Sequence, residues 1–256
     1  MLLSAAGSGK TTLLVRKALE RPLRRIGIVT YTLENLEEIR RSFEFHAGAV
    51  PAHVTLHSWY GFLLRECIRP YQAALCREPR IESILFVEGR TNNRAPRSQV
   101  ARHYFAGNRV YSDRAADFAV RCDELTQGQV IARLADMYDE VYVDEVQDLA
   151  GYDLDLIERL LKSSIAVTLV GDTRQATYAT NYAPATASFA DRTSRLCSSF
   201  GNLTACARSI TASRVCAVCR RFVILPTRST HRCLGRSQAM IRLRAMMAST
   251  SSHRSM

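Results

Sequence analysis

The segment that most constrains the fold is SAAGSGKTT at residues 4–12, a glycine-rich turn followed by the start of a helical pattern. Such a turn lets backbone N–H groups surround a phosphate chain at the N-terminus of the next helix. In that arrangement Lys10 reaches the β- and γ-phosphates of a nucleoside triphosphate, and the Thr11 hydroxyl binds Mg²⁺. A turn of this kind joins a buried strand to a helix, so it predicts an α/β fold.

A second motif, VYVDEVQD, begins at Val141. Residues 141–143 form an apolar strand that ends at Asp144 and Glu145, and parallel sheets place their ligand chemistry at this end of their strands. Asp144 can complete the Mg²⁺ shell, and Glu145 can orient the attacking water or act as a base. An acidic pair alone is often only solvated. Together with the glycine loop, it indicates a site that binds and hydrolyses a nucleoside triphosphate.

Three further segments accompany these two motifs: VTYTLENLEEI at 29–39, TLHSW at 55–59 and GDTRQATY at 171–178. In spelling and order, the five motifs resemble those of UvrD/Rep-like helicases of superfamily 1, where Ala or Ser commonly replaces the first loop glycine, as Ser4 does here. The resemblance covers residues 2–180. It implies a RecA-like P-loop NTPase core with a parallel sheet, with ATP and Mg²⁺ as its cofactors. It also implies a motor domain that moves 3′-to-5′ along single-stranded DNA.

The same resemblance assigns roles to single residues. Gln175 would sense the γ-phosphate and act with Lys10 and Glu145 as a catalytic residue. The implied nucleotide-binding residues are Ala5, Ala6, Gly7, Ser8, Gly9, Lys10, Thr11 and Thr12. The implied Mg²⁺ ligands are Thr11 and Asp144.

Other motif residues are predicted to contact single-stranded DNA. Every base has a π-face, so an aromatic ring binds bases without reading their sequence. Tyr178 and Trp59 are candidate platforms, although a half-buried loop residue is the alternative for Tyr178 and a core residue is the alternative for Trp59. His57 contacts DNA or pins its own loop. The predicted DNA-binding residues are Thr30, Tyr31, Thr32, His57, Ser58, Trp59 and Tyr178.

Apolar periodicity agrees with an α/β fold. The pattern predicts helices over 9–19, 34–45 and 123–139 and strands over 26–30, 54–56 and 165–170. Residues 70–125 break the alternation with three prolines and are predicted to form a small inserted subdomain, similar to subdomain 1B of the helicase family. The ATP-binding domain is therefore predicted to span residues 1–180, with this insertion inside it.

Residues 181–256 differ from the rest of the chain in composition. Lys and Arg total 35 against 24 acidic residues, a net charge of +11, yet no Asp or Glu follows Asp191. The same stretch holds 12 arginines, no lysine and five of the eight cysteines. Two interpretations remain open: a disordered basic arm that binds nucleic acid, and a segment translated out of frame. Neither predicts a packed domain.

Cysteine spacing and hydropathy limit the other classes of site. Cys216 and Cys219 have the spacing of half a zinc site, but His231 and Cys233 lie too close together to supply the second half, so free cysteines are expected. No run of about 18 apolar residues could span a membrane, and no secretory signal precedes the glycine loop. A phosphate loop with unpaired thiols fits the reducing cytoplasm.

The ends of the chain also bear on its function. Only residues 1–3 precede Ser4, which leaves a short first strand and no place for the adenine-recognising Q motif. The second RecA-like domain, with motifs IV–VI, has no counterpart either, so the expectation is a first motor domain truncated at both ends. The alternatives are a nucleotide-dependent DNA-binding module without unwinding activity and a non-functional, truncated or frameshifted gene product. The oligomeric state stays open.

Overall fold

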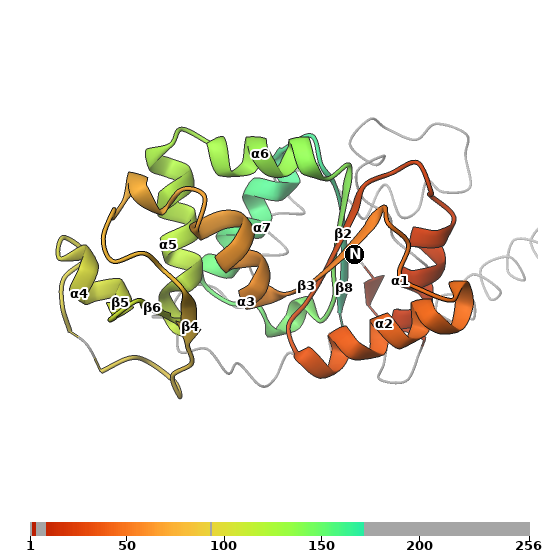
Figure 1. Cartoon of the computed structure of the whole chain (residues 1–256), viewed down its shortest axis with the longest axis horizontal. Helices are drawn as coiled ribbons and strands as arrows, with labels where there is room; N and C mark the ends of the chain where they lie inside the picture. The colour runs from red at the N-terminus through yellow and green to blue at the C-terminus, as the bar shows by residue number, and fades with distance from the viewer. Residues whose placement is uncertain (1, 4–8, 93, 172–256) are drawn as a thin grey trace, which may run out of the picture.

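A computed structural model describes residues 2–3, 9–92 and 94–171, and its main feature is a five-stranded sheet (Figure 1). The strand order is β1-β8-β7-β2-β3, and each neighbouring pair is parallel, as predicted. The strands are β1 (Leu2–Leu3), β2 (Ile26–Thr30), β3 (Val54–Ser58), β7 (Glu140–Val143) and β8 (Ala166–Gly171). The predicted fold class, an α/β core of RecA-like type, is therefore confirmed.

Helices supply the crossovers that parallel strands require. They are α1 (Lys10–Leu19) between β1 and β2, α2 (Leu33–Ala47) between β2 and β3, and α7 (Tyr152–Lys162) between β7 and β8. In the register of the sheet, Val29 on β2 lies opposite Val143 on β7, and Thr30 lies opposite Ser58 on β3. The carboxyl ends of these three strands therefore meet at one edge of the sheet.

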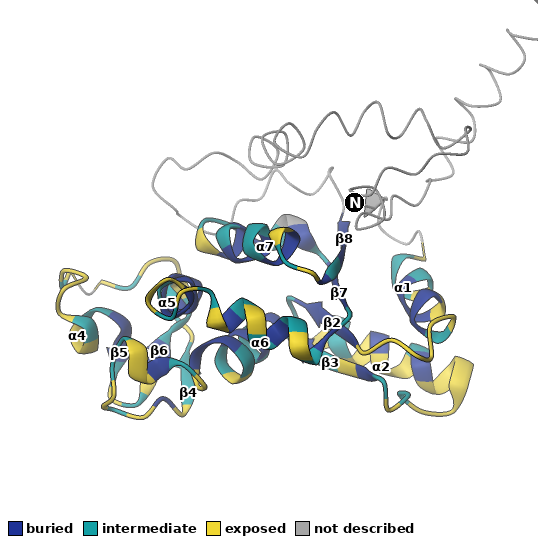
Figure 2. Ribbon diagram, turned by 90° about the horizontal axis from the view of Figure 1, so that it is seen from above, coloured by how far each residue is buried: buried dark blue, intermediate teal, exposed yellow. Residues whose placement is uncertain are grey.

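Both faces of the sheet are covered, which explains why the central strands β2 and β7 are buried along their whole length. Ile26, Ile28 and Tyr142 pack against α1 and α2, whereas Val141 and Val143 belong to the cluster on the opposite face. Figure 2 views the sheet close to edge-on, with α1 and α2 on one side and α5, α6 and α7 on the other. The core is thus a three-layer α/β/α arrangement.

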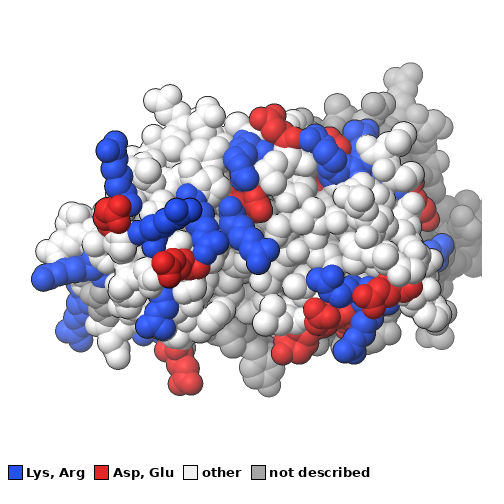
Figure 3. Space-filling model, viewed as in Figure 1, with Lys and Arg blue, Asp and Glu red and all other residues white. Residues whose placement is uncertain are grey.

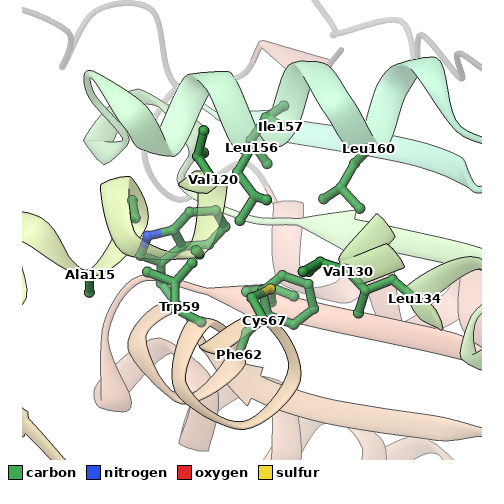
Figure 4. Close-up of a cluster of buried hydrophobic side chains, with 14 of the residues drawn as sticks. Trp59, Phe62, Cys67, Ala115, Val120, Val130, Leu134, Leu156, Ile157 and Leu160 are labelled. Atoms are coloured by element: carbon green, nitrogen blue, oxygen red, sulfur yellow. The ribbon is translucent and has the colours of Figure 1, made fainter. Parts of the chain in front are cut away.

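The larger hydrophobic cluster fills the layer on the α7 side (Figure 4). Its lower wall is α3 (Trp59–Phe62), which continues into a π-helix, η1 (Leu63–Ile68). Trp59, Phe62 and Cys67 from these helices are at most 1% exposed, and Leu156 and Leu160 of α7 cover them. Helical backbone therefore runs from Trp59 to Ile68, in two parts.

A second, smaller sheet lies within the range predicted as an insertion. Its order is β4-β6-β5, and Figure 1 shows it at the far left of the molecule. The elements here are η2 (Gln72–Ala74), β4 (Ser83–Leu85), α4 (Val100–Tyr104), β5 (Phe105–Ala106) and β6 (Arg109–Tyr111). The next helix, α5 (Ser112–Leu125), contacts η1 and α7, and its buried apolar residues belong to the larger cluster. The range 70–125 therefore includes one helix of the main core.

The helix predicted over 123–139 is two helices. α5 ends at Leu125, and α6 (Gln129–Met137) starts after Gly128, whose φ is +89°. The buried Asp123 fixes the turn, because its carboxylate accepts hydrogen bonds from the Ile131 N–H and from Arg159. Both helices have the same apolar period, so periodicity alone did not reveal the break. No helix in the described part of the chain is long and apolar enough to cross a bilayer.

Candidate active site

The site is built around the start of α1. Gly9 precedes this helix with a φ of +76°, a left-handed conformation that strains any residue with a Cβ. Gly9 has no side chain to cap the helix, and the first turn of α1 holds no acidic residue. The first N–H groups of a helix have no partner inside it, and the helix dipole makes this end positive. The start of α1 is therefore suited to an anion such as a phosphate.

Lys10 and Glu145 meet although 135 positions separate them in the sequence. The Nζ atom of Lys10 lies 3.1 Å from both carboxylate oxygens of Glu145. The side chains are only 10% and 20% exposed, so water screens this ion pair less than a surface pair. Glu145 itself has a φ of +50°, which is rare for a residue other than glycine and is typical of functional sites. Two of the three predicted catalytic residues thus share one site.

Asp144 lies beside this pair at the end of β7 and is 4% exposed. Its N–H donates to the Val29 carbonyl at 2.8 Å, but its Oδ1 atom has no hydrogen-bond partner among the described residues. Burial, followed by the negative charge of Glu145, raises the pKa of Asp144 to about 6. A buried carboxylate oxygen without a donor is costly unless a cation neutralises it. The residue therefore fits the predicted role of Mg²⁺ ligand.

The other loop residues that the structure describes lie next to Lys10. Thr11 is half-buried and follows Lys10 in the first turn of α1, whereas Thr12 is exposed. Within the described ranges, no group of three or more His, Cys, Asp or Glu is placed to hold a metal ion. Mg²⁺ is usually held by one or two carboxylates together with substrate phosphates and water, so this scarcity of protein ligands does not conflict with an Mg²⁺ site.

Thr30 was predicted to contact DNA, and the structure contradicts this. Thr30 is 1% exposed, and its Oγ1 atom has no hydrogen-bond partner in the described part of the chain. Val29 on β2 pairs with Val143 on β7. The next residues along the chain, Thr30 and Asp144, therefore lie at equivalent positions on neighbouring segments. Thr30 therefore contributes a second unsatisfied oxygen to the buried edge that holds Asp144, and its hydroxyl is out of reach of a DNA strand.

We expect Asp144→Asn to stabilise the ligand-free protein at neutral pH. Because the folded state raises the pKa of Asp144, it holds the proton more tightly than the unfolded state does. The contribution of Asp144 to the stability of the parent is then greatest below its ordinary pKa and is lost as the pH rises from there through about 6. At pH 8 the variant should be more stable by on the order of 2–3 kcal/mol, and at pH 4 the difference should vanish.

Urea unfolding of both proteins at the two pH values measures this difference. Asp136→Asn, at an exposed position on α6, is the matched control and should behave like the parent. A difference in stability between Asp144→Asn and the parent that does not change with pH would contradict the assignment of the titration to Asp144.

A groove of about 800 Å³ separates the end of β2 and the start of α3 from the insertion. Tyr31, Thr32 and Ser58, all predicted to contact DNA, line it together. So do two residues that the sequence patterns did not single out, Tyr60 and Phe86, whose rings lie 5.0 Å apart in an edge-to-face contact. Phe86 is 67% exposed. The sequence signal that could have marked it is an aromatic residue within an arginine-rich segment.

Two other DNA-contact predictions are wrong because their side chains are buried. Trp59 is 1% exposed: its ring stacks on Phe62, and its indole N–H donates to Asp153. A base cannot reach a ring in this position, so Trp59 is a core residue. His57 is 5% exposed, with its Nε2 atom 2.9 Å from the hydroxyl of Tyr138. His57 therefore connects β3 to the residue that follows α6.

The remaining predicted site residues lie outside the described residues. They are Ala5, Ala6, Gly7 and Ser8 of the glycine loop, together with Gln175 and Tyr178. The predictions for the segment 181–256, including its cysteines, lie outside them as well.

A parallel sheet, a helix that starts at a glycine loop, and a lysine facing a strand-end acidic pair define a P-loop nucleotide-binding domain. The chain belongs to the AAA domain family, whose family model matches residues 1–181. Domains of this kind occur in UvrD/Rep-like helicases. A comparison with curated proteins finds no match.

Proposed function

We propose that this protein binds and hydrolyses ATP as the motor domain of a DNA helicase or translocase that acts on single-stranded DNA. One observation carries the proposal: Lys10 and Glu145 meet at the carboxyl edge of the sheet, next to the buried carboxylate of Asp144, whose Oδ1 atom has no hydrogen-bond partner among the described residues. A lysine that can hold phosphates, a carboxylate that can hold a cation and a second carboxylate that can act on water are what ATP hydrolysis requires.

The geometry suggests how these residues divide the work. In the ligand-free protein Lys10 neutralises Glu145, and an incoming triphosphate competes for Lys10 because its β- and γ-phosphates carry more negative charge. Glu145 is then released to orient a water molecule and accept its proton. Thr11 and Asp144 are the residues that would hold Mg²⁺, which when bound neutralises charge on the phosphate oxygens.

The groove supports the choice of nucleic acid as the second ligand. Its walls carry aromatic rings, on which bases stack, and hydroxyl groups, which can donate to phosphates. Two acidic residues, Glu34 and Asp113, also line it, so the attraction for phosphate comes from the surrounding surface. The half of the molecule around it is basic, with ten arginines and five acidic residues over residues 63–114. Figure 3 shows basic side chains gathered over this half, with fewer acidic ones between them. A positive field of this kind attracts a phosphate backbone.

Two measurements on the parent protein test the proposal. Calorimetry with ATP and Mg²⁺ should detect binding to a single site, and phosphate release should exceed that of a Lys10→Ala control. Fluorescence anisotropy with a labelled single-stranded oligonucleotide of mixed sequence should detect binding. Absence of ATP binding would overturn the whole proposal. Absence of oligonucleotide binding would overturn the DNA substrate and leave only the assignment as a nucleotide hydrolase.

Leu33→Glu should weaken oligonucleotide binding roughly 5-fold, because it adds one negative charge to the groove. Leu33 lines the groove and is 65% exposed, so the change removes little core packing. It is also the first residue of α2, where an acidic side chain suits the helix dipole. The stability of the variant should therefore match that of the parent.

Leu23→Glu is the matched control, since Leu23 is 95% exposed and lies outside the groove. All titrations are run at one raised salt concentration, because the arginines that follow Asp191 bind phosphate in a salt-dependent manner. Equal affinities of Leu33→Glu and Leu23→Glu for the oligonucleotide would exclude the groove as the binding surface.

A further inference from the structure

The only tryptophan of the chain forms a direct bond between two functional regions. Trp59 is the first residue of α3, and its indole N–H donates to Oδ1 of Asp153 at 2.8 Å. Asp153 lies in the first turn of α7, on a different crossover of the sheet. The two residues are 1% and 8% exposed. A hydrogen bond between a donor and a carboxylate that are both buried is stronger than a surface bond and more costly to break.

On the α7 side, Asp153 holds the end of the segment that begins at the active site. Its Oδ2 atom accepts a hydrogen bond from the Ala150 N–H at 3.2 Å, and its own N–H donates to the Ala150 carbonyl. The segment between Glu145 and Gly151 is short and is bounded by these two residues, which have φ values of +50° and +55°. Asp153 is therefore connected to Glu145 through a few residues of backbone.

On the α3 side, both sequence neighbours of Trp59 line the groove. Ser58 caps α3 by accepting a hydrogen bond from the Gly61 N–H at 3.2 Å, and Tyr60 contacts the Tyr31 hydroxyl through its own at 3.2 Å. A Cβ on Gly61 would lie 2.8 Å from the Ser58 hydroxyl oxygen, so this turn leaves no room for a larger residue. These contacts fix the two groove residues on either side of Trp59.

We propose that the hydrogen bond from Trp59 to Asp153 couples the nucleotide site to the groove, with Trp59 as a positioning residue. A ligand that moves the groove wall moves the indole, and the indole moves Asp153 and the segment that carries Glu145. This inference rests on the proposed function, because it names the residue that links binding of the nucleotide to binding of single-stranded DNA. A purely structural role for Trp59 predicts a loss of stability without any change in coupling.

The test is the ratio of oligonucleotide affinities with and without a non-hydrolysable ATP analogue. The parent should show a ratio of roughly 5-fold or more in either direction. Trp59→Phe keeps an aromatic ring against Phe62 but removes the N–H, and its ratio should fall to about one while each ligand alone still binds. Phe62→Leu is the matched control, because it removes buried volume from the same cluster and leaves the bond intact; it should keep the ratio of the parent.

A double variant separates coupling from stability. Trp59→Phe leaves the Asp153 carboxylate without one of its donors, and adding Asp153→Asn removes that uncompensated charge. The double variant should regain stability without regaining the coupling ratio. A ratio in Trp59→Phe equal to that of the parent would overturn the inference, and so would a ratio of one in a parent that binds both ligands. Failure of the parent to bind the nucleotide would overturn the proposed function instead. Titration of the parent with the ATP analogue alone detects that failure.

A second measurement needs no variant of Trp59. Because the chain has a single tryptophan, its fluorescence reports this one hydrogen bond. Adding the nucleotide analogue to the parent should change the emission, and the same addition to Lys10→Ala should not. Identical emission of the parent with the nucleotide site empty and saturated would contradict a mechanical connection between the two regions.

Discussion

Replacing Lys10 by alanine is expected to abolish ATP binding, with a rise in Kd of about 100-fold or more. Among the residues that the structure describes, Lys10 is the cation that lies against the strand-end acidic pair, and its Nζ atom is 3.1 Å from Glu145. Without it, a triphosphate would approach Asp144 and Glu145 with no positive side chain between them. The loss therefore combines a missing charge-assisted contact with uncompensated repulsion.

Isothermal titration calorimetry with Mg²⁺ and a non-hydrolysable ATP analogue measures this loss. Lys162→Ala is the matched control, since it removes an exposed lysine that pairs only with Glu158 one helical turn away. It should bind the analogue as the parent does. Equal Kd values for Lys10→Ala and the parent would remove the phosphate-loop assignment.

Glu145→Gln should abolish hydrolysis while leaving nucleotide binding intact. An amide has nearly the shape of the carboxylate but cannot accept a proton from water, so the loss in turnover should be roughly 10²- to 10⁴-fold. Binding should persist because Lys10 no longer has an anionic partner in the ligand-free protein and remains available to the phosphates. This combination of effects distinguishes a general base from a residue that only holds the nucleotide.

Phosphate release under saturating ATP gives the rate, and calorimetry gives the affinity of the same preparation. Glu158→Gln, on the exposed face of α7, is the control for a general effect of losing a carboxylate. Turnover by Glu145→Gln at the rate of the parent would exclude Glu145 as the base. A parallel loss of affinity would instead indicate that its main role is structural.

The residues of the candidate nucleotide site that the structure brings together could be predicted because their arrangement follows from local sequence. A glycine must stand where φ is positive, and Gly9 does. An acidic pair must follow a buried strand, and Asp144 and Glu145 follow β7. In a parallel sheet the carboxyl ends of the strands lie at one edge, so the acidic pair after β7 is expected to lie close to Lys10.

Fewer of the residues predicted to contact DNA are accessible in the structure, and this too has a physical reason. At the end of a strand, successive side chains point in opposite directions, and the motif does not say which direction is toward solvent. Ser58 and Trp59 are adjacent, yet one lines the groove and the other is 1% exposed. Only the position of α7, whose Asp153 accepts the indole N–H, decides between the two environments.

The sequence by itself determined the α/β alternation, the parallel sheet and the pairing of a phosphate loop with a strand-end acidic pair, because periodicity and backbone conformation act over a few neighbouring residues. Tertiary structure alone decided that Thr30 is buried beside Asp144, that α5 belongs to the main core, and that Phe86 faces the groove. Each of these depends on contacts between segments far apart in the chain. Burial is a property of what packs above a residue, and no local pattern contains that information.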